Sequence, residues 1–219
     1  MDKSKQIAKI LLEIKAVTLN VKEPYKYSSG IVSPIYCDNR LLLSYPKQRQ
    51  KVRDAFIEII RSNKLNFDIV GGTATAGIPH AAWLADALQK PMIYIRSKSK
   101  GYGKNKLIEG NLTNGQKVLI IDDLVSTGGS CCEAVQTVRS EGGIAEDCLA
   151  IFTYQLTQSE QNFKKARVNL YFLTNLSILL DTAVYDNYIT LKDKKSVLEW
   201  ARDPEHWHDS FRPQKNRAK

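Results

Sequence analysis

Short apolar runs alternate with helical segments from Phe67 onward, and this alternation constrains the fold more than any other feature of the chain. Two intervening segments, residues 77–88 and 130–140, have helical periodicity. Strands that alternate with helices form a parallel sheet covered on both faces, and ligands bind beyond the carboxyl ends of its strands. We therefore expect an α/β fold, with a central parallel sheet built from residues 67–72, 92–95, 117–122, 149–154 and 168–173.

The two ends of the chain have a different pattern. Residues 4–19 carry apolar side chains at helical spacing, and residues 24–45 are rich in Pro, Gly, Ser and Tyr, as in turns and short strands. A helix is expected after Pro46, because proline suits the first helical turn. We expect one domain over residues 1–219, with a small N-terminal hood of about residues 1–45, a C-terminal helix of the hood at about 192–203, and a core of about 46–190.

The composition excludes several classes of protein. A chain of 219 residues, 43% of them hydrophobic, can bury a sizeable core. No apolar run approaches the roughly 20 residues that a membrane helix needs, and the N-terminus lacks a signal-peptide core, so we expect a cytoplasmic protein. The four cysteines form no CxxC pair, which disfavours a structural zinc site. The net charge of +9 favours an anionic partner.

Residues 118–130 contain the most specific motif. A buried strand ends in Asp122 and Asp123, a turn of hydroxyls and glycines follows, and a helix begins. Glycines let the backbone approach a phosphate closely, and the amides and hydroxyls of residues 126–130 are donors at a helix N-terminus. The two carboxylates would repel that phosphate, so they suit ribose hydroxyls or a Mg²⁺ shell reached through water. A ligand with a phosphate at one end and a diol in the middle satisfies both parts.

This stretch resembles the binding motif for phosphoribosyl pyrophosphate (PRPP) in the type I phosphoribosyltransferases. The resemblance implies the type I phosphoribosyltransferase fold, with the acidic pair beside the ribose and the loop around the 5′-phosphate. The chain lacks the GxxxxGK[ST] sequence of a P-loop, which disfavours a nucleotide triphosphatase. The PRPP-binding residues implied by this motif are Asp122, Asp123, Leu124, Val125, Ser126, Thr127, Gly128, Gly129 and Ser130.

Residues 27–40 resemble the N-terminal signature of orotate phosphoribosyltransferases, in which this segment covers the base. Its Ser-Ser-Gly turn offers amides and hydroxyls to a small polar anion, and Tyr36 offers a flat face to a pyrimidine. The residues implied in orotate binding are Ser28, Ser29, Gly30, Tyr36 and Ser126.

A basic, glycine-containing segment follows the second predicted strand. Five cations precede the first acid within residues 96–110, and two glycines make the segment pliable. Such a segment suits closure on a polyanion such as pyrophosphate. In orotate phosphoribosyltransferases this loop, residues 96–107 here, closes over the active site of the partner subunit, so the resemblance implies a homodimer. It also implies that Arg96 and Lys100 contact pyrophosphate, and that Tyr102 belongs to the PRPP-binding residues.

The resemblance implies an enzyme that joins orotate to the ribose 5-phosphate of PRPP. The products would be orotidine 5′-monophosphate and pyrophosphate, in the biosynthesis of UMP. The cofactor would be Mg²⁺, held mainly through PRPP and water and without protein ligands. Orotate and PRPP are the expected small-molecule partners, and neither nucleic acid nor a membrane is expected. The catalytic residues implied are Arg96, Lys100, Asp122 and Asp123.

The sequence departs from the family pattern at several positions. Tyr102 stands where the loop usually has histidine, and a tyrosine carries no charge near neutral pH. Other branches have lysines at the positions of Ser28 and Ala76, and an arginine for the orotate carboxylate near Tyr154. Orotate recognition then depends on Ser126 and on the backbone of the Ser-Ser-Gly turn.

Two other functions fit part of the sequence. A purine phosphoribosyltransferase would share the PRPP motif but not the signature in residues 27–40, and assays with guanine, adenine and xanthine would distinguish it. A PRPP-sensing regulator that binds nucleic acid would fit the net charge of +9 and the basic C-terminal tail, and its binding would weaken steeply with salt. No recognition-helix or stacking-aromatic pattern supports such a regulator.

Overall fold

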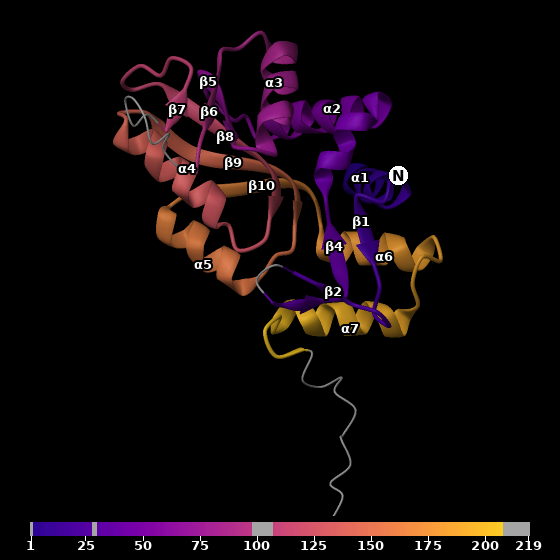
Figure 1. The fold of residues 1–219 in the computed structure, drawn as a ribbon. Helices are drawn as coiled ribbons and strands as arrows, with labels where there is room; N and C mark the ends of the chain where they lie inside the picture. Colours follow the sequence, from indigo (N-terminus) through magenta and orange to yellow (C-terminus); the bar gives the residue numbers. More distant parts are fainter. Residues whose placement is uncertain (1, 28–29, 98–106, 208–219) are drawn as a thin grey trace, which may run out of the picture.

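The computed structural model describes residues 2–27, 30–97 and 107–207, and a six-stranded sheet forms its centre (Figure 1). The strands are β5 (Ile69–Thr73), β6 (Met92–Ile95), β7 (Ile108–Glu109), β8 (Lys117–Val125), β9 (Ile144–Thr153) and β10 (Asn169–Asn175). Their order is β10-β9-β8-β5-β6-β7, and neighbouring strands are parallel except β7, which pairs antiparallel with β6 at the edge. The predicted α/β fold with a mainly parallel central sheet is confirmed.

Helices cover both faces of this sheet. They are α1 (Lys3–Glu13), α2 (Pro46–Ser62), α3 (Gly77–Leu88), α4 (Gly129–Ser140) and α5 (Thr157–Ala166). The side chains of β8 alternate between two apolar cores, as the pleat of a strand requires. Leu119 and Ile121 belong to the core with α1, α2 and α3, whereas Val118 and Ile120 belong to the core with α4 and α5. Within the described residues, no helix has both the length and the apolar character to cross a membrane.

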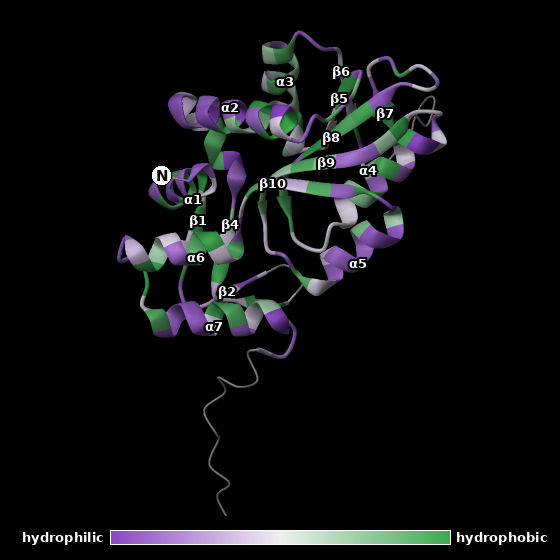
Figure 2. Ribbon diagram, turned by 180° about the vertical axis from the view of Figure 1, so that it is seen from behind, coloured by the Kyte–Doolittle hydropathy of each residue, from purple (hydrophilic) through white to green (hydrophobic). Residues whose placement is uncertain are grey.

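The segments of the predicted hood lie together beside one end of the sheet (Figure 1). Besides α1, they comprise β1 (Val17–Leu19), β2 (Tyr25–Lys26), β3 (Val32–Ser33), β4 (Ile35–Cys37), the 3₁₀ helix η1 (Asn39–Ser44) and α7 (Leu191–Arg202). β1 pairs antiparallel with β4, and β2 with β3. A further helix, α6 (Leu176–Tyr185), contacts both α1 and α7. Both α6 and α7 alternate hydrophobic and hydrophilic stretches (Figure 2), as amphipathic helices with one buried face do. The division into hood and core stays a prediction.

The helix predicted over residues 4–19 is wrong in its C-terminal part. α1 ends at Glu13, and Lys15 adopts a positive φ of 57°, which a helix cannot continue through. Val17 was expected on the helical face, one turn after Ile14. It is buried instead in β1, where it pairs with Cys37. Pairing with a distant strand thus overrides the local spacing of apolar residues.

Trp200 fixes α7 to the hood strands. Its Nε1 donates a hydrogen bond to the carbonyl oxygen of Val32 at 3.1 Å. Its ring packs edge-on against Tyr154, with the ring centroids 5.6 Å apart. At the other end, α7 begins with a capping box between Thr190 and Asp193. The C-terminal end of α7 is therefore held beside the residue that follows β9.

Candidate active site

The two aspartates predicted to be catalytic lie at the carboxyl end of β8, and both are buried. Protein donors fix the Asp122 carboxylate. Its Oδ2 accepts hydrogen bonds from Ser130 Oγ at 2.9 Å and from Cys131 Sγ at 3.3 Å. Its Oδ1 accepts the backbone amide of Asp123 at 2.9 Å. The end of β8 and the first turn of α4 therefore orient this carboxylate before any ligand is bound.

Asp123 has a different environment. Burial and the neighbouring Asp122 carboxylate raise the pKa of Asp123 to about 7, and the Arg40 guanidinium partly offsets this rise. Asn39 Nδ2 donates a hydrogen bond to the Asp123 carbonyl oxygen at 2.7 Å. Arg40 is itself held by Asp38, with Nε and Nη2 donating to the two carboxylate oxygens at 2.6 and 2.9 Å. Asn39, at the start of η1, therefore fixes the backbone of Asp123, and the positive charge of Arg40 acts on the Asp123 carboxylate.

Residues 126–130, which we call the phosphate turn, link β8 to α4. Ser126 and Thr127 are exposed, and Asn162 Nδ2 donates a hydrogen bond to the Thr127 carbonyl oxygen at 2.9 Å. Gly128 has a positive φ of 79°, and a Cβ atom at this position would lie 2.6 Å from Cε2 of Phe163. Only glycine fits this conformation and this space without rearrangement. The turn is thus shaped by α5 as well as by its own sequence.

The remaining residues of the predicted PRPP motif take positions around this turn. Leu124 and Val125 complete β8, and Gly129 and Ser130 begin α4. The Ser130 hydroxyl donates to Asp122, so its role as a phosphate donor stays a prediction. The motif residues therefore converge on one strand-turn-helix unit.

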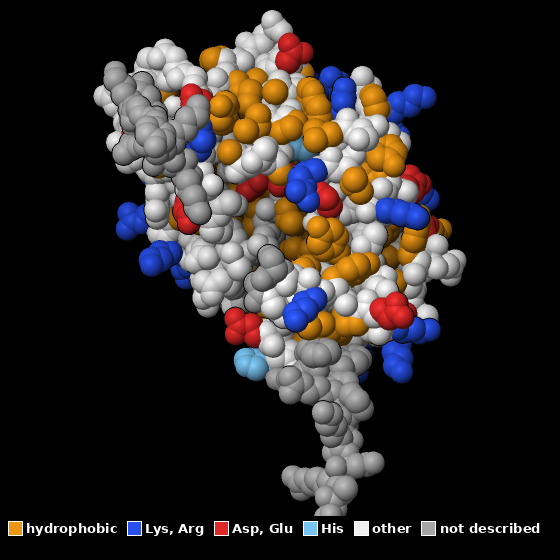
Figure 3. Space-filling model, viewed as in Figure 1, with side chains coloured by type: hydrophobic (Ala, Val, Ile, Leu, Met, Phe, Trp, Pro, Cys, Tyr) orange, Lys and Arg blue, Asp and Glu red, His pale blue; other side chains and the backbone are white. Residues whose placement is uncertain are grey.

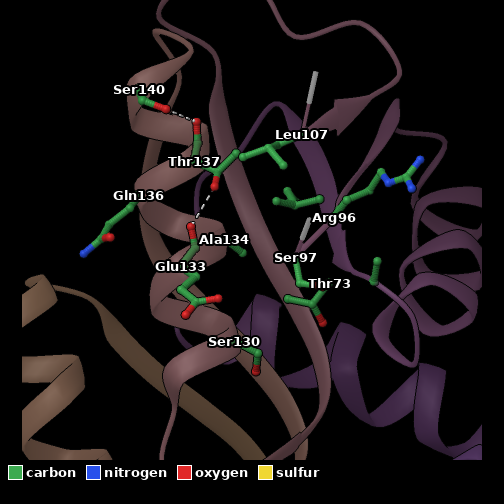
Figure 4. Close-up of a pocket in the computed structure, with 12 residues that line it drawn as sticks. Thr73, Arg96, Ser97, Leu107, Ser130, Glu133, Ala134, Gln136, Thr137 and Ser140 are labelled. Atoms are coloured by element: carbon green, nitrogen blue, oxygen red, sulfur yellow. Dashed lines mark hydrogen bonds between the residues drawn. The ribbon is translucent and has the colours of Figure 1, made fainter. Parts of the chain in front are cut away.

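A cavity of about 380 Å³ lies between α4 and the ends of β5 and β6 (Figure 4). In Figure 4 the Arg96 side chain points away from α4, and its Nη1 lies 3.4 Å from Oε1 of Glu109. The Arg96 guanidinium is therefore directed toward Glu109 and not toward α4. The residues that line the cavity include Thr73, Arg96, Ser97, Ser130 and Glu133.

Three tyrosines of the hood form an aromatic cluster. The Tyr36 ring is 40% exposed and lies 5.6 Å from the Tyr25 ring and 6.2 Å from the Tyr27 ring, measured between centroids. Tyr27 Oη donates a hydrogen bond to the Ile35 carbonyl oxygen at 2.6 Å. Gly30, with a positive φ of 89°, donates its amide to the Tyr27 carbonyl oxygen at 2.9 Å. The Gly30 amide is thus already hydrogen-bonded within its own turn. Orotate binding by Gly30 and Tyr36 stays a prediction.

A second cavity, of about 510 Å³, lies between the phosphate turn and the hood. Ser126 and Thr127 line one side, Tyr27 and Ile31 a second, Tyr154 and Leu156 a third, and the end of α7 a fourth. The cavity therefore brings Ser126, the predicted orotate ligand of the phosphate turn, close to the hood aromatics.

On the face shown in Figure 3, acidic and basic side chains meet near the middle, among hydrophobic ones.

The whole chain, and not only its motifs, is similar to known proteins. A family model described as the phosphoribosyl transferase domain matches residues 41–155. The orotate phosphoribosyltransferase of Coxiella burnetii is 53% identical over 207 residues, which cover 94% of this chain and 99% of that protein. The chain belongs to the orotate phosphoribosyltransferase family. The resemblance predicted from the motifs is thereby confirmed.

Solved structures of the orotate phosphoribosyltransferase family share the fold. The enzyme from Aeropyrum pernix has a TM-score of 0.72 at 29% identity, covering 82% of this chain and 98% of that chain. The Mycobacterium tuberculosis H37Rv enzyme, solved in complex with PRPP, has a TM-score of 0.64 at 21% identity, covering 81% of this chain and 98% of that chain. This second likeness shows the fold alone. Together they confirm the predicted type I phosphoribosyltransferase fold.

Some assignments based on the orotate phosphoribosyltransferase family cannot be placed. Ser28, Ser29, Lys100 and Tyr102 lie outside the described residues. The structure does place Tyr154, near which other branches of the family carry an arginine. Its side chain is buried and packs against Phe152 and Trp200, and Tyr-Gln-Leu-Thr, with no arginine, follows β9 here. Any cation for the orotate carboxylate has to come from another part of the chain.

Proposed function

We propose that this chain is an orotate phosphoribosyltransferase that transfers ribose 5-phosphate from PRPP to orotate. The products are orotidine 5′-monophosphate and pyrophosphate, as in the biosynthesis of UMP. One observation carries the proposal: the buried acidic pair and the phosphate turn converge at the carboxyl end of β8, in a chain 53% identical to a protein named for this activity. The Mycobacterium tuberculosis relative binds PRPP, which supports PRPP as a substrate.

Within this proposal, the phosphate turn and the acidic pair hold opposite sides of the ribose phosphate. Amides of the turn and the α4 N-terminus accept the 5′-phosphate. Asp122, already oriented by Ser130 and Cys131, and Asp123 hold the ribose hydroxyls. Negative charge on the acidic pair offsets the positive charge that develops at the anomeric carbon when the bond to pyrophosphate breaks. The orotate ring nitrogen attacks that carbon, so no covalent enzyme intermediate forms.

The departing pyrophosphate requires positive charge. Arg96 and Lys100 supply it in this proposal, and Tyr102 contributes a hydroxyl donor. Arg96 leaves Glu109 when the loop of residues 96–107 closes. Donors aimed at charge that develops in the transition state stabilise it more than they stabilise the substrate, and this accelerates the reaction.

The proposed cofactor is Mg²⁺, and the donor groups of the site fit it. Both oxygens of Asp122 already accept hydrogen bonds from protein groups. Asp123 is therefore the carboxylate of this site that would hold a hydrated Mg²⁺, an ion that often binds through substrate oxygens and water. When bound, the ion would supply positive charge for the departing pyrophosphate.

The proposed assembly is a homodimer in which the loop of residues 96–107 acts on the partner subunit. The proposed location is the cytoplasm. All four cysteines are free thiols, which agrees with a reducing compartment.

The direct test is a spectrophotometric assay of the purified chain with orotate, PRPP and Mg²⁺. We expect the orotate absorbance to fall only when all three are present. Guanine, adenine and xanthine serve as competing acceptors in parallel reactions. Turnover of a purine without turnover of orotate would reassign the chain to the purine enzymes. No turnover at all, with salt-sensitive binding of RNA or DNA, would favour the regulator instead.

A further inference from the structure

The 510 Å³ cavity beside the phosphate turn has the size of a small-molecule site. Three walls are uncharged: the exposed hydroxyls of Ser126 and Thr127, the hood residue Tyr27, and the buried ring of Tyr154. Through Tyr27 the cavity adjoins the aromatic cluster that includes Tyr36. A flat, polar ring therefore fits between the phosphate turn and the hood.

The fourth wall, formed by the end of α7 and the residues after it, carries the charges. Among the described residues that line the cavity, Arg202 is the only lysine or arginine. No described residue forms a hydrogen bond or ion pair with its side chain. Asp203 and Glu205 also line the cavity, but Asp203 is engaged by His206, whose Nδ1 lies 2.9 Å from Oδ1. Arg202 is thus the available partner for an anionic group in this cavity.

The position of Arg202 is set by the fold. It is the last residue of α7, two residues after Trp200, which is bound to the Val32 carbonyl and packed on Tyr154. The end of the helix therefore stays beside the cavity. Arginine presents a planar fork of donors that matches a carboxylate in a bidentate pair. The segment after β9 that lines the cavity, from Tyr154 to Gln158, offers no such group.

We propose that Arg202 binds the carboxylate of orotate from the C-terminal end of α7. It thereby determines the preference for a carboxylated pyrimidine over an uncharged one. This inference rests on the proposed function and adds to it a residue from a segment that the motifs do not include.

The test uses two nucleotides that differ only in the carboxylate, orotidine 5′-monophosphate and uridine 5′-monophosphate. Their dissociation constants are measured by calorimetry for the wild-type protein and for Arg202→Gln. We expect the variant to bind orotidine 5′-monophosphate about 10- to 100-fold more weakly, as loss of a charged hydrogen bond predicts. Binding of uridine 5′-monophosphate should stay within about twofold, because it lacks the group that Arg202 contacts.

Steady-state kinetics give an independent measurement. The KM for orotate should rise by a similar factor in Arg202→Gln while the KM for PRPP is unchanged, and Arg202→Lys should recover part of the loss because it keeps the charge without the fork. Glu205→Gln removes a negative charge from the wall that carries Arg202. Since this charge would repel the carboxylate of orotate, the variant should bind orotate more tightly or equally well. Arg61→Gln, an exposed arginine on α2, is the matched control.

The outcomes separate the two proposals. If the wild-type chain does not turn over orotate, the proposed function fails. If it does, and Arg202→Gln has wild-type affinity for orotidine 5′-monophosphate, the role of Arg202 is overturned. An equal loss of affinity for both nucleotides would also overturn it, since that pattern indicates a structural role for the residue.

Discussion

Asp122 and Asp123 are neighbours in sequence, yet the fold gives them different chemistry. Asp122 accepts hydrogen bonds from protein donors on both carboxylate oxygens. Burial and the Asp122 charge raise the pKa of Asp123 to about 7. The folded protein thus holds a proton on Asp123 that the unfolded chain would lose near pH 4. Ionised Asp123 at higher pH therefore costs stability, which is tolerable at a site built for a ligand with hydroxyl donors.

This difference predicts how stability depends on pH. Since the folded pKa of Asp123 exceeds the unfolded one, wild-type stability should fall as pH rises from about 4 to about 7. The variant Asp123→Asn has no carboxyl group at this position, so its stability lacks this pH dependence. The free energy of unfolding of the wild type should therefore fall relative to that of the variant by roughly 4 kcal/mol over this range, at about 1.36 kcal/mol per pKa unit. Denaturant unfolding at a series of pH values measures it.

The matched control is Asp86→Asn, because Asp86 is exposed on α3. Its stability difference from the wild type should be flat over the same pH range. A flat difference for Asp123→Asn as well would show that Asp123 is ionised throughout, and the assigned pKa would be wrong.

At the residue scale, the sequence predicts the residues of the motif but not the distant residues that hold them in place. The position of Asp122 and Asp123 follows from an apolar strand that ends before a glycine-rich turn. The hydrogen bond from Asn39 to Asp123 and the charge of Arg40 that acts on Asp123, in contrast, involve residues more than 80 positions apart. Nothing in the local sequence marks Cys131 either, although its thiol donates to Asp122 from the first turn of α4. Such contacts depend on tertiary structure, so no local pattern marks them.

At the scale of elements, the phosphate turn and α5 depend on one another through Gly128. Alanine at this position would place its Cβ 2.6 Å from the Phe163 ring at a φ of 79°. We expect Gly128→Ala to destabilise the protein by roughly 1–3 kcal/mol and to weaken PRPP binding, since the turn has to shift. Thermal unfolding and titration with PRPP measure the two effects.

Gly129→Ala provides the comparison, since the nearest atom to its Cβ would be Thr127 Oγ1 at 3.8 Å. This variant should keep the stability of the wild type. In a Phe163→Leu background, Gly128→Ala should cost less stability than it does in the wild type, because the collision is relieved while the unfavourable φ remains. Equal stability of the two single alanine variants would contradict this account of the turn.

The elements themselves were predicted unevenly, for physical reasons. Strong periodicity bounded by turn residues located α3 and β6 at residues 77–88 and 92–95, as the structure has them. β8 is longer than predicted because Leu124 and Val125 pair with β9 despite the two acids before them. The two-residue strand β7 exists only through its pairing with β6, which a local pattern does not reveal. Neither α5 nor α6 was predicted.

At the scale of the whole molecule, the proposed homodimer makes a prediction for mixed subunits. Lys100→Ala alone should lower the rate by about 10²–10³, and Asp123→Asn should also be impaired. If the loop acts in trans, a hybrid dimer of the two variants contains one intact site, with Asp123 from one subunit and Lys100 from the other. Random re-association of equal amounts should then restore about a quarter of wild-type activity.

Each variant taken through the same dissociation and re-association alone is the control, and neither should recover. No recovery in the mixture, with hybrid dimers demonstrated by mass, would mean that loop and acidic pair act within one subunit. A fully active monomer at assay concentration would contradict the shared site altogether.

Helix α1 near the N-terminus packs against α6 near the C-terminus, and this has a consequence for folding during synthesis on the ribosome. The apolar face of α1, with Ile7 and Leu11 buried in the finished protein, needs α6 as a neighbour. About 160 further residues have to be translated after α1 before α6 exists, which takes on the order of 10–30 s at cellular elongation rates. During that interval the first helix of the nascent chain lacks this cover, so folding of the N-terminal segment is completed only after translation has nearly ended.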